Sequence, residues 1–150
     1  MIVGIGVDLV DIDRVERMIR GREERVLKRL FTFREVDYAR KRADPWRHYA
    51  ARLAAKEATF KALAGNDLAK AINWKDIEVV MHSDGRPSLA LHGHAKRRAA
   101  QLRITRALVT LTHSQNAAAA MVVLEGDGEE VGGAAEPGPA PEPGDMVGPS

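Results

Sequence analysis

The sequence predicts an α+β domain whose mostly antiparallel sheet packs against one long helix and several short helices. Three observations indicate this fold class: a strand pattern opens the chain, helix patterns fill most of its first half, and strand patterns with one helix between them fill the second half. Strands and helices that are segregated in this way favour an antiparallel sheet over the alternating units of a parallel one.

The first predicted element is a strand over residues 2–10, which has apolar residues on both of its alternating faces and is therefore expected to be buried. Asp11 can cap a short helix that ends at Gly21, because three apolar residues recur there at helical spacing: Ile12, Val15 and Ile19. A second short helix is expected over residues 23–30.

Two further helix starts are well specified. Thr32 and Glu35 have the spacing of a capping box, and Asp44 followed by Pro45 combines an N-cap with a proline in the first helical position. The second of these starts opens the longest predicted helix, which runs to about Ala64.

The second half of the chain completes the sheet. Residues 77–82 and 88–92 flank the turn-like sequence SDGRP and predict a hairpin. A basic helix is expected over residues 94–102, followed by closing strands over residues 107–112 and 118–124.

The composition limits the class of protein. The 150 residues suffice for one domain with its own core, and the absence of cysteine excludes disulfides, thiolate metal sites and a cysteine nucleophile. No apolar run could span a membrane, and no basic signal region precedes the first strand. We therefore expect a soluble, cytoplasmic protein.

The net charge of +2 hides an asymmetry. The segment from Gly126 to Ser150 holds six acids and no lysine or arginine, so residues 1–125 carry the other 15 acids against all 23 bases, a balance of +8. This surplus favours an anionic partner, although a solvated basic surface is the alternative. The same segment holds five of the seven prolines and seven of the thirteen glycines, which predicts a disordered tail after a domain of residues 1–125.

Two carboxylates occupy positions where the pattern predicts apolar side chains. Asp8 lies inside the first strand, and Glu57 lies in the long helix on a stripe with Tyr49, Leu53, Phe60 and Ala64. A bare buried carboxylate costs several kcal/mol, so each must be paired, neutralised or bound to a cation. Glu57 could instead form a surface pair with Lys61, one helical turn away.

A strand that packs against this helix would bring the two carboxylates together. Mg²⁺ is typically held by one or two carboxylates and takes phosphate oxygens and waters as its other ligands, while a lysine supplies a point charge to the same phosphate. Asp8, Glu57 and Lys61 therefore indicate phosphoryl-type chemistry.

Five motifs in order and spacing carry a family resemblance: GIGVDLVDIDRVERM, FTFREVDYA, RLAAKEATFKALAG, GRPSLALHG and VTLTHSQNAAAAMVV. They resemble the holo-(acyl-carrier-protein) synthases, a family of 4'-phosphopantetheinyl transferases, and the resemblance covers Met1 to Glu125. It implies transfer of phosphopantetheine from coenzyme A to a serine of apo acyl carrier protein, with release of adenosine 3',5'-bisphosphate.

The resemblance also implies roles for individual residues. Asp8 and Glu57 align with the Mg²⁺ ligands, and Lys61 with the lysine near the coenzyme A diphosphate. Glu57 or a metal-held water could accept the serine proton, and the sequence does not decide between them.

The family assembles as a homotrimer with its coenzyme pocket between subunits. By similarity, the pocket would be lined by Arg52, Gly65, Arg86, Pro87, His113 and Ser114. For His113 and Ser114 the alternative is a polar residue at a strand end or in a turn.

The resemblance also implies that the first helix binds the acyl carrier protein. Its arginines would dock the acidic helix of the carrier protein beside the metal, and the resemblance adds a methionine to that surface, which comprises Arg14, Arg17, Met18 and Arg20.

Two other functions compete with this one. A metal-dependent nuclease or phosphatase would use the carboxylate cluster of Asp8, Asp11 and Asp13, but Asp11 and Asp13 have the position of helix-start residues. A nucleic-acid-binding module would explain the basic domain, but the chain is only 5% aromatic and lacks interleaved basic and stacking residues. We expect no nucleic-acid partner.

Overall fold

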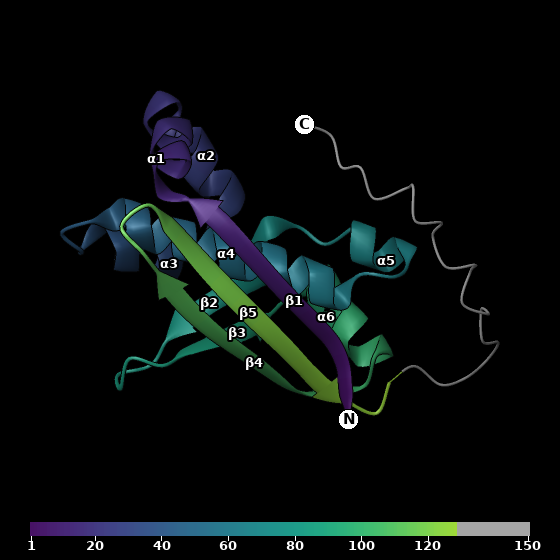
Figure 1. The fold of residues 1–150 in the computed structure, drawn as a ribbon. Coiled ribbons are helices and arrows are strands. Elements are labelled where there is room, and N and C mark those ends of the chain that lie inside the picture. Colours follow the sequence, from purple (N-terminus) through teal and green to yellow (C-terminus); the bar gives the residue numbers. More distant parts are fainter. Residues whose placement is uncertain (129–150) are drawn as a thin grey trace, which may run out of the picture.

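The computed structural model describes residues 1–128 (Figure 1). In chain order its elements are β1 (Ile2–Asp11), α1 (Ile12–Gly21), α2 (Glu23–Leu30), α3 (Phe33–Arg40), α4 (Pro45–Leu63), α5 (Asp67–Lys70), a 3₁₀ turn (Trp74–Asp76), β2 (Ile77–Met81), β3 (Pro87–Leu91), α6 (Gly93–Gln101), β4 (Ile104–His113) and β5 (Ala117–Gly126). No helix of this part of the chain is long and apolar enough to cross a membrane.

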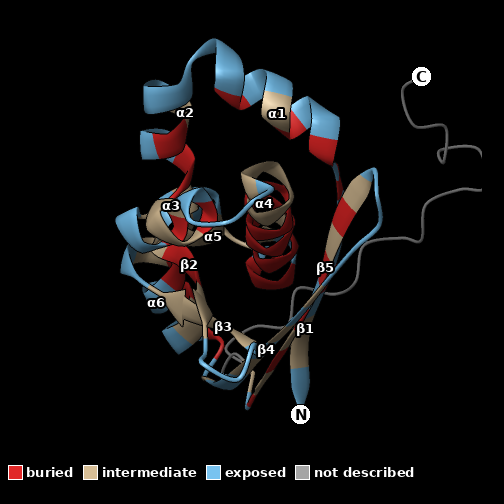
Figure 2. Cartoon of the chain, turned by 90° about the vertical axis from the view of Figure 1, so that its left-hand side faces the viewer, coloured by how far each residue is buried: buried red, intermediate tan, exposed pale blue. Residues whose placement is uncertain are grey.

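Every strand pairing in residues 1–128 is antiparallel. One sheet has the order β1-β5-β4, and β2 and β3 form a separate hairpin. The hairpin lies beside β4, so the two sheets continue around α4 (Figures 1 and 2). The α+β class with a mostly antiparallel sheet is confirmed.

Helix α4 lies at the centre of the molecule and is buried on nearly every side (Figure 2). It contacts the β1-β5-β4 sheet, α1, α3, α6 and β2. The predicted apolar stripe was therefore the wrong description of this helix, because it is enclosed by layers on several sides and has no single buried face. Within it Glu57 is half-buried while its neighbours Lys56 and Ala58 are buried, and Ala64, the last stripe residue, is exposed.

Glycines let β1 lie directly on α4. A side-chain carbon built at Gly6 would stand 1.8 Å from the carbonyl oxygen of Ala58, and one at Gly4 would stand 2.2 Å from that of Ala62. Gly4, Gly6 and Asp8 alternate on one face of the strand, so this close contact also brings Asp8 to the helix.

The expectation that β1 is buried on both faces was wrong. Ile5, Val7 and Leu9 are 67%, 62% and 72% exposed, and Met121, opposite Val7 on β5, is 51% exposed. These side chains form an apolar outer face of the sheet, whereas the alternate residues pack on α4. We call this set the outer sheet face.

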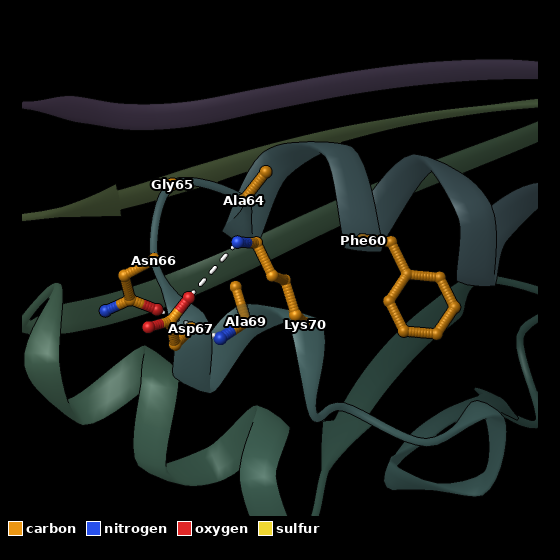
Figure 3. Close-up of a pocket in the computed structure, with 7 residues that line it drawn as sticks. All are labelled: Phe60, Ala64, Gly65, Asn66, Asp67, Ala69 and Lys70. Atoms are coloured by element: carbon orange, nitrogen blue, oxygen red, sulfur yellow. Dashed lines mark hydrogen bonds and ion pairs between the residues drawn. The ribbon is translucent and has the colours of Figure 1, made fainter.

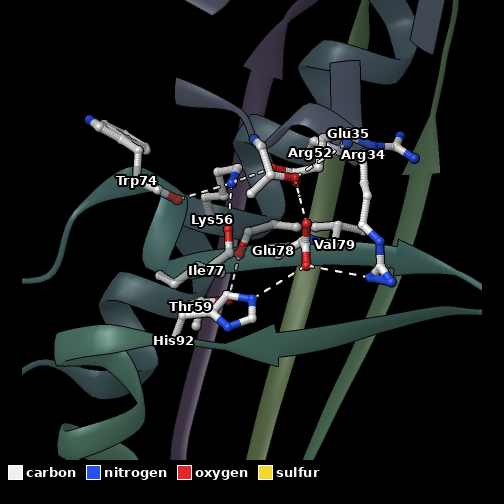
Figure 4. A network of polar contacts seen from close by, with 12 residues as sticks. Arg34, Glu35, Arg52, Lys56, Thr59, Trp74, Ile77, Glu78, Val79 and His92 are labelled. Carbon is white, nitrogen blue, oxygen red and sulfur yellow. Dashed lines mark hydrogen bonds and ion pairs between the residues drawn. The ribbon is translucent and has the colours of Figure 1, made fainter. Parts of the chain in front are cut away.

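A buried polar network joins α3, α4 and β2 (Figure 4). The Lys56 ammonium is wholly buried, lies 2.8 Å from a carboxylate oxygen of Glu35, and donates to the carbonyl oxygens of Trp74 and Ile77. Glu35 also accepts from the backbone N–H groups of Thr32 and Val79. All three lysine protons have acceptors, so this buried pair is well satisfied.

The predicted helix starts are confirmed. Asp11 caps α1, Thr32 and Glu35 form the capping box of α3, and Asp44 caps α4 before Pro45. At the other end of the chain, β5 includes Gly126, one residue into the predicted tail, and residues 129–150 of that tail lie outside the described residues.

Candidate active site

Asp8 and Lys61 meet where β1 crosses α4. The Lys61 ammonium lies 3.1 Å from a carboxylate oxygen of Asp8 and donates to the backbone carbonyl of Val7 at 2.9 Å. Glu57 lies one helical turn before Lys61 and interacts with the Asp8 carboxyl group. The structure thus brings together the three residues predicted to be catalytic.

The electrostatics of this cluster suit a bound cation. Burial and then the adjacent Asp8 carboxylate raise the pKa of Glu57, while Lys61 and Arg14 act in the opposite direction. The second carboxylate oxygen of Asp8 is buried and has no hydrogen-bond partner among the described residues. An unsatisfied anionic oxygen beside a second carboxyl group is what a divalent cation would compensate.

The donor set here is small. Among residues 1–128 no group of three or more histidine, cysteine or acidic residues is placed to hold a metal. Asp11 accepts from the backbone N–H of Asp13 as a helix cap, and Asp13 is exposed in the first turn of α1. Asp11 and Asp13, which a nuclease would need as metal ligands, therefore serve to start a helix. Asp8 and Glu57 remain available to bind a cation whose other ligands are phosphate and water.

A pocket of about 180 Å³ joins this cluster to α1. Glu57, Arg14 and Met18 line it together with apolar residues, among them Leu9 and Trp74. All four predicted docking residues, Arg14, Arg17, Met18 and Arg20, are exposed. Arg20 already pairs with Glu16 at 3.0 Å and stacks on Trp46, so Arg14 and Arg17 are the less engaged cations of this helix.

A second cluster of predicted residues lies elsewhere. Arg52, Pro87 and His113 line a pocket of about 340 Å³ between α4, the β2–β3 hairpin and β4, together with Tyr38, Arg47 and His48. We call it the arginine pocket.

The arginine pocket is electropositive. Burial lowers the pKa of Arg52, and burial together with the charges of Arg52, Arg47 and Arg42 lowers the pKa of His48. The Nε atoms of Arg47 and Arg52 are buried without a hydrogen-bond partner in the described part of the chain. Buried donors of this kind suit an anionic ligand.

The remaining predicted residues are dispersed. Gly65 has φ +128° and lines a pocket of about 450 Å³ at the end of α4 (Figure 3). Arg86 pairs with Asp84 at 2.7 Å at the tip of the hairpin, outside the arginine pocket. The Ser114 hydroxyl accepts from the backbone N–H groups of Asn116 and Ala117, which is the turn role left open as its alternative.

Within one chain the two clusters do not converge. Asp8 lies on β1 and His113 on β4, the opposite edges of the sheet. Glu57 and Arg52 are five residues apart on α4 and therefore project from different sides of the helix.

Sequence and structure comparisons identify the family. The sequence model of the 4'-phosphopantetheinyl transferase superfamily matches residues 4–122. The chain belongs to this superfamily. Within it the chain belongs to the holo-(acyl-carrier-protein) synthases: that of Geobacter metallireducens is 46% identical over 125 residues, covering 83% of this chain and 98% of the relative.

Solved holo-(acyl-carrier-protein) synthases share the fold. The protein of Neisseria meningitidis superposes with a TM-score of 0.73 at 24% identity, covering 83% of this chain and 99% of its own. That of Bacillus anthracis, solved in complex with CoA (3',5'-ADP), has a TM-score of 0.67 at 32% identity and coverages of 85% and 99%. The chain is therefore a phosphopantetheinyl transferase, and the family resemblance is confirmed.

Sequence reasoning missed three residues of this holo-(acyl-carrier-protein) synthase that line the arginine pocket: Tyr38, Arg47 and His48. A signal existed in the basic residues 40–42 and in the Arg47–His48 pair before Arg52. Their convergence depends on how α3 crosses α4, which spacing along the chain does not reveal.

Proposed function

We propose that this chain transfers the 4'-phosphopantetheine group of coenzyme A to a serine of apo acyl carrier protein, with Mg²⁺ held by Asp8 and Glu57. The observation that supports this most directly is the buried, unpartnered oxygen of Asp8 beside Glu57 and Lys61. Bound there, Mg²⁺ would offset negative charge on the coenzyme A diphosphate as its bond breaks.

The reaction is a phosphoryl-type displacement. The serine oxygen bonds to the phosphorus that bears the pantetheine arm, and the bond from that phosphorus to the bridging oxygen breaks. Adenosine 3',5'-bisphosphate leaves with that oxygen and its electron pair. The serine proton passes to Glu57 or to a water molecule beside it, and Lys61 supplies positive charge to the diphosphate.

The dispersed site residues support a homotrimer with active sites between subunits. The outer sheet face exposes Ile5, Val7, Leu9 and Met121, and large apolar surfaces of this kind are typical of interfaces. Packing the faces of several copies together would allow the arginine pocket of one subunit to approach the Asp8–Glu57 cluster of the next, which one chain alone cannot do.

Light scattering tests the assembly. Val7→Lys should convert the protein to a monomer, because a buried unpaired ammonium opposes association. Phe33→Lys is the matched control, since Phe33 is 85% exposed on α3, which packs on α4 and β2 rather than on the outer sheet face. A trimeric Val7→Lys variant, or a monomeric wild-type protein, would contradict the proposed assembly.

The carrier protein would dock on α1. Arg14, Arg17 and Met18 are exposed beside the pocket that Glu57 lines, so an acidic helix bound there would present its serine to the cluster. Charge pairing on such a surface raises the association rate and weakens with salt.

Mass spectrometry of apo acyl carrier protein, incubated with coenzyme A, Mg²⁺ and this protein, tests the transfer. We expect a mass gain of one phosphopantetheine group, lost when Mg²⁺ is chelated and in Glu57→Gln. Glu24→Gln removes an exposed carboxylate that pairs with Arg40 and should keep full activity. The absence of any mass gain with the wild-type protein would refute the proposed function.

A further inference from the structure

Tyr38 stands at the centre of the positive charges beside the arginine pocket. The guanidinium carbon of Arg42 lies 3.9 Å from the centroid of its ring, and that of Arg52 lies 4.3 Å from the same centroid. The His48 ring approaches edge-on, with its centroid 5.6 Å away and an interplanar angle of 72°. One tyrosine ring therefore contacts three cationic or basic side chains.

Among the described residues no carboxylate forms an ion pair with these cations, although Glu35 attracts Arg52 from beyond ion-pair distance. In the described part of the chain, neither Arg42 nor Arg52 forms an ion pair, whereas neighbouring Lys41 pairs with Asp37 at 2.9 Å. Burial lowers the pKa of Arg52 most, and the charge of Arg42 lowers it further, which is the repulsion between the two guanidinium groups. Without a stabilising contact, the two guanidinium groups would move apart when no anion is bound.

An aromatic face supplies that contact. The negative electrostatic potential over a tyrosine ring attracts guanidinium groups, more strongly where water is partly excluded. Arg52 is only 2% exposed, donates from Nη1 to the backbone carbonyl of His48 at 3.2 Å, and also interacts with the Tyr38 hydroxyl group. Its Nε–H is left without an acceptor among residues 1–128.

The position of Tyr38 is itself fixed by the fold. Glu35, one turn earlier on α3, pairs with buried Lys56, and Arg52 lies one turn before Lys56 on α4. Helices α3 and α4 are therefore joined by two contacts one helical turn apart, Glu35 with Lys56 and Tyr38 with Arg52. Figure 4 shows Arg52 and Lys56 beside Glu35 in this network.

We propose that Tyr38 is a positioning residue that holds the Arg52 and Arg42 guanidinium groups together beside the arginine pocket, ready for a phosphate group of coenzyme A. This inference rests on the proposed function for the identity of the ligand. Arg42, which no motif singles out, thereby becomes a second cation for that phosphate. Because the cations are gathered before the ligand arrives, binding requires less rearrangement.

The proposal predicts a specific kinetic change. Tyr38→Leu should raise the KM for coenzyme A about five- to tenfold, the loss expected for partly desolvated cation–π contacts, and leave kcat nearly unchanged. Tyr38→Phe keeps the ring face but loses the hydroxyl contact with Arg52, so its affinity should lie clearly nearer to wild type than that of Tyr38→Leu. Calorimetry with adenosine 3',5'-bisphosphate should show the same order of affinities without any transfer reaction.

A second pair of variants keeps the test valid if Tyr38→Leu misfolds. Arg42→Gln should weaken binding of adenosine 3',5'-bisphosphate about three- to tenfold, and Lys41→Gln, an adjacent exposed cation with its own partner, should not. Repeating the titration with coenzyme A that lacks its 3'-phosphate identifies the phosphate. If Arg42→Gln weakens binding of this ligand less than it weakens binding of adenosine 3',5'-bisphosphate, Arg42 contacts the 3'-phosphate. If it weakens binding of both ligands equally, Arg42 contacts the phosphate groups that the two ligands share.

Several results would overturn the positioning role: a folded Tyr38→Leu variant with unchanged affinity, equal losses in Tyr38→Phe and Tyr38→Leu, or equal losses in Arg42→Gln and Lys41→Gln. Failure of the proposed function looks different, because the wild-type protein itself would then neither bind nor consume coenzyme A.

Discussion

Asp8 is the side chain on which the proposed metal site depends most. One of its carboxylate oxygens contacts the Lys61 ammonium at 3.1 Å, while the other is buried without a partner in the described residues. Glu57 stands beside it with a raised pKa, caused first by burial and then by Asp8 itself. The pair repels itself until a cation or a proton arrives.

This arrangement predicts a pH dependence of metal binding. A carboxyl group with a raised pKa takes up its proton at a higher pH than an ordinary glutamate, so Mg²⁺ affinity should fall as the pH drops through the weakly acidic range. Lys61→Met removes a charge that lowers this pKa and should move the fall to higher pH. Calorimetric Mg²⁺ titrations at several pH values measure both effects.

An affinity that stays constant across that range would contradict the assignment of Glu57 as a ligand. Arg17→Met is a control, because this exposed cation on α1 is not among the causes of the Glu57 shift and should leave the pH profile unchanged.

At this scale the sequence predicts the Asp8–Glu57–Lys61 cluster but only part of the arginine pocket that we propose for coenzyme A. Asp8 and Glu57 stand out because a carboxylate inside an apolar run needs an explanation. Tyr38 and Arg42 do not, because a tyrosine and an arginine near a helix end are ordinary surface residues until α3 and α4 are packed together.

Among the elements, the contact between β1 and α4 brings Asp8 to Glu57 and Lys61. Gly6→Ala would put a methyl group at 1.8 Å from the Ala58 carbonyl oxygen, so β1 or α4 must shift. We expect a loss of at least about 2 kcal/mol in unfolding free energy, together with reduced transfer. Gly21→Ala, at the end of α1 where no described atom lies within 4 Å, should be neutral or stabilising by up to about 1 kcal/mol. Chemical denaturation compares the two, and equal stabilities would refute the packing argument.

Substitutions in the buried polar network of Lys56 and Glu35 should change the unfolding free energy in a way that depends on charge pairing. Lys56→Met leaves the Glu35 carboxylate buried without its partner and should cost about 3–5 kcal/mol, because a lone buried charge is poorly solvated. Adding Glu35→Gln removes that charge and should recover part of the loss. Lys41→Met breaks an exposed pair with Asp37 and should cost no more than about 1 kcal/mol. A double variant less stable than Lys56→Met would show that the network does not act as a charge pair.

The helices and strands can be predicted closely from the sequence, because capping residues near their ends determine where the helices start. Asp11, Thr32 and Asp44 each accept a backbone hydrogen bond at a helix start, and these are the residues the sequence selects. The α5 turn and the 3₁₀ turn after it were missed, since helices of three or four residues have no periodicity. The exposed face of β1 was mistaken for core, because an apolar residue gives the same sequence pattern whether it faces the core or the surface.

For the whole molecule, the separation of the two clusters predicts complementation between inactive variants. Asp8→Ala lacks the metal cluster, and Arg52→Gln lacks a cation of the arginine pocket. If each active site combines one cluster from each of two neighbours, trimers mixed randomly in equal amounts should regain about a quarter of the wild-type activity, since one site in each mixed trimer is intact. Refolding the two variants together and measuring transfer tests this.

The transfer activity should recover only when subunits of the two variants assemble in the same trimer. The same two variants, refolded separately and then combined, should stay inactive for as long as subunits do not exchange. Activity that never recovers after joint refolding, while wild-type protein refolded in parallel is active, would place both clusters in the same subunit.

The alternation along β1 also gives its residues two distinct genetic signatures. Gly4, Gly6 and Val10 face α4 within the chain, whereas Ile5, Val7 and Leu9 face outwards. In a mutational scan, a reporter of monomer folding should reject changes at the inward set and tolerate polar residues at the outward set. If the proposed trimer forms, a selection for growth that depends on the enzyme should reject changes in both sets, and the difference between the two maps would then mark the assembly surface residue by residue.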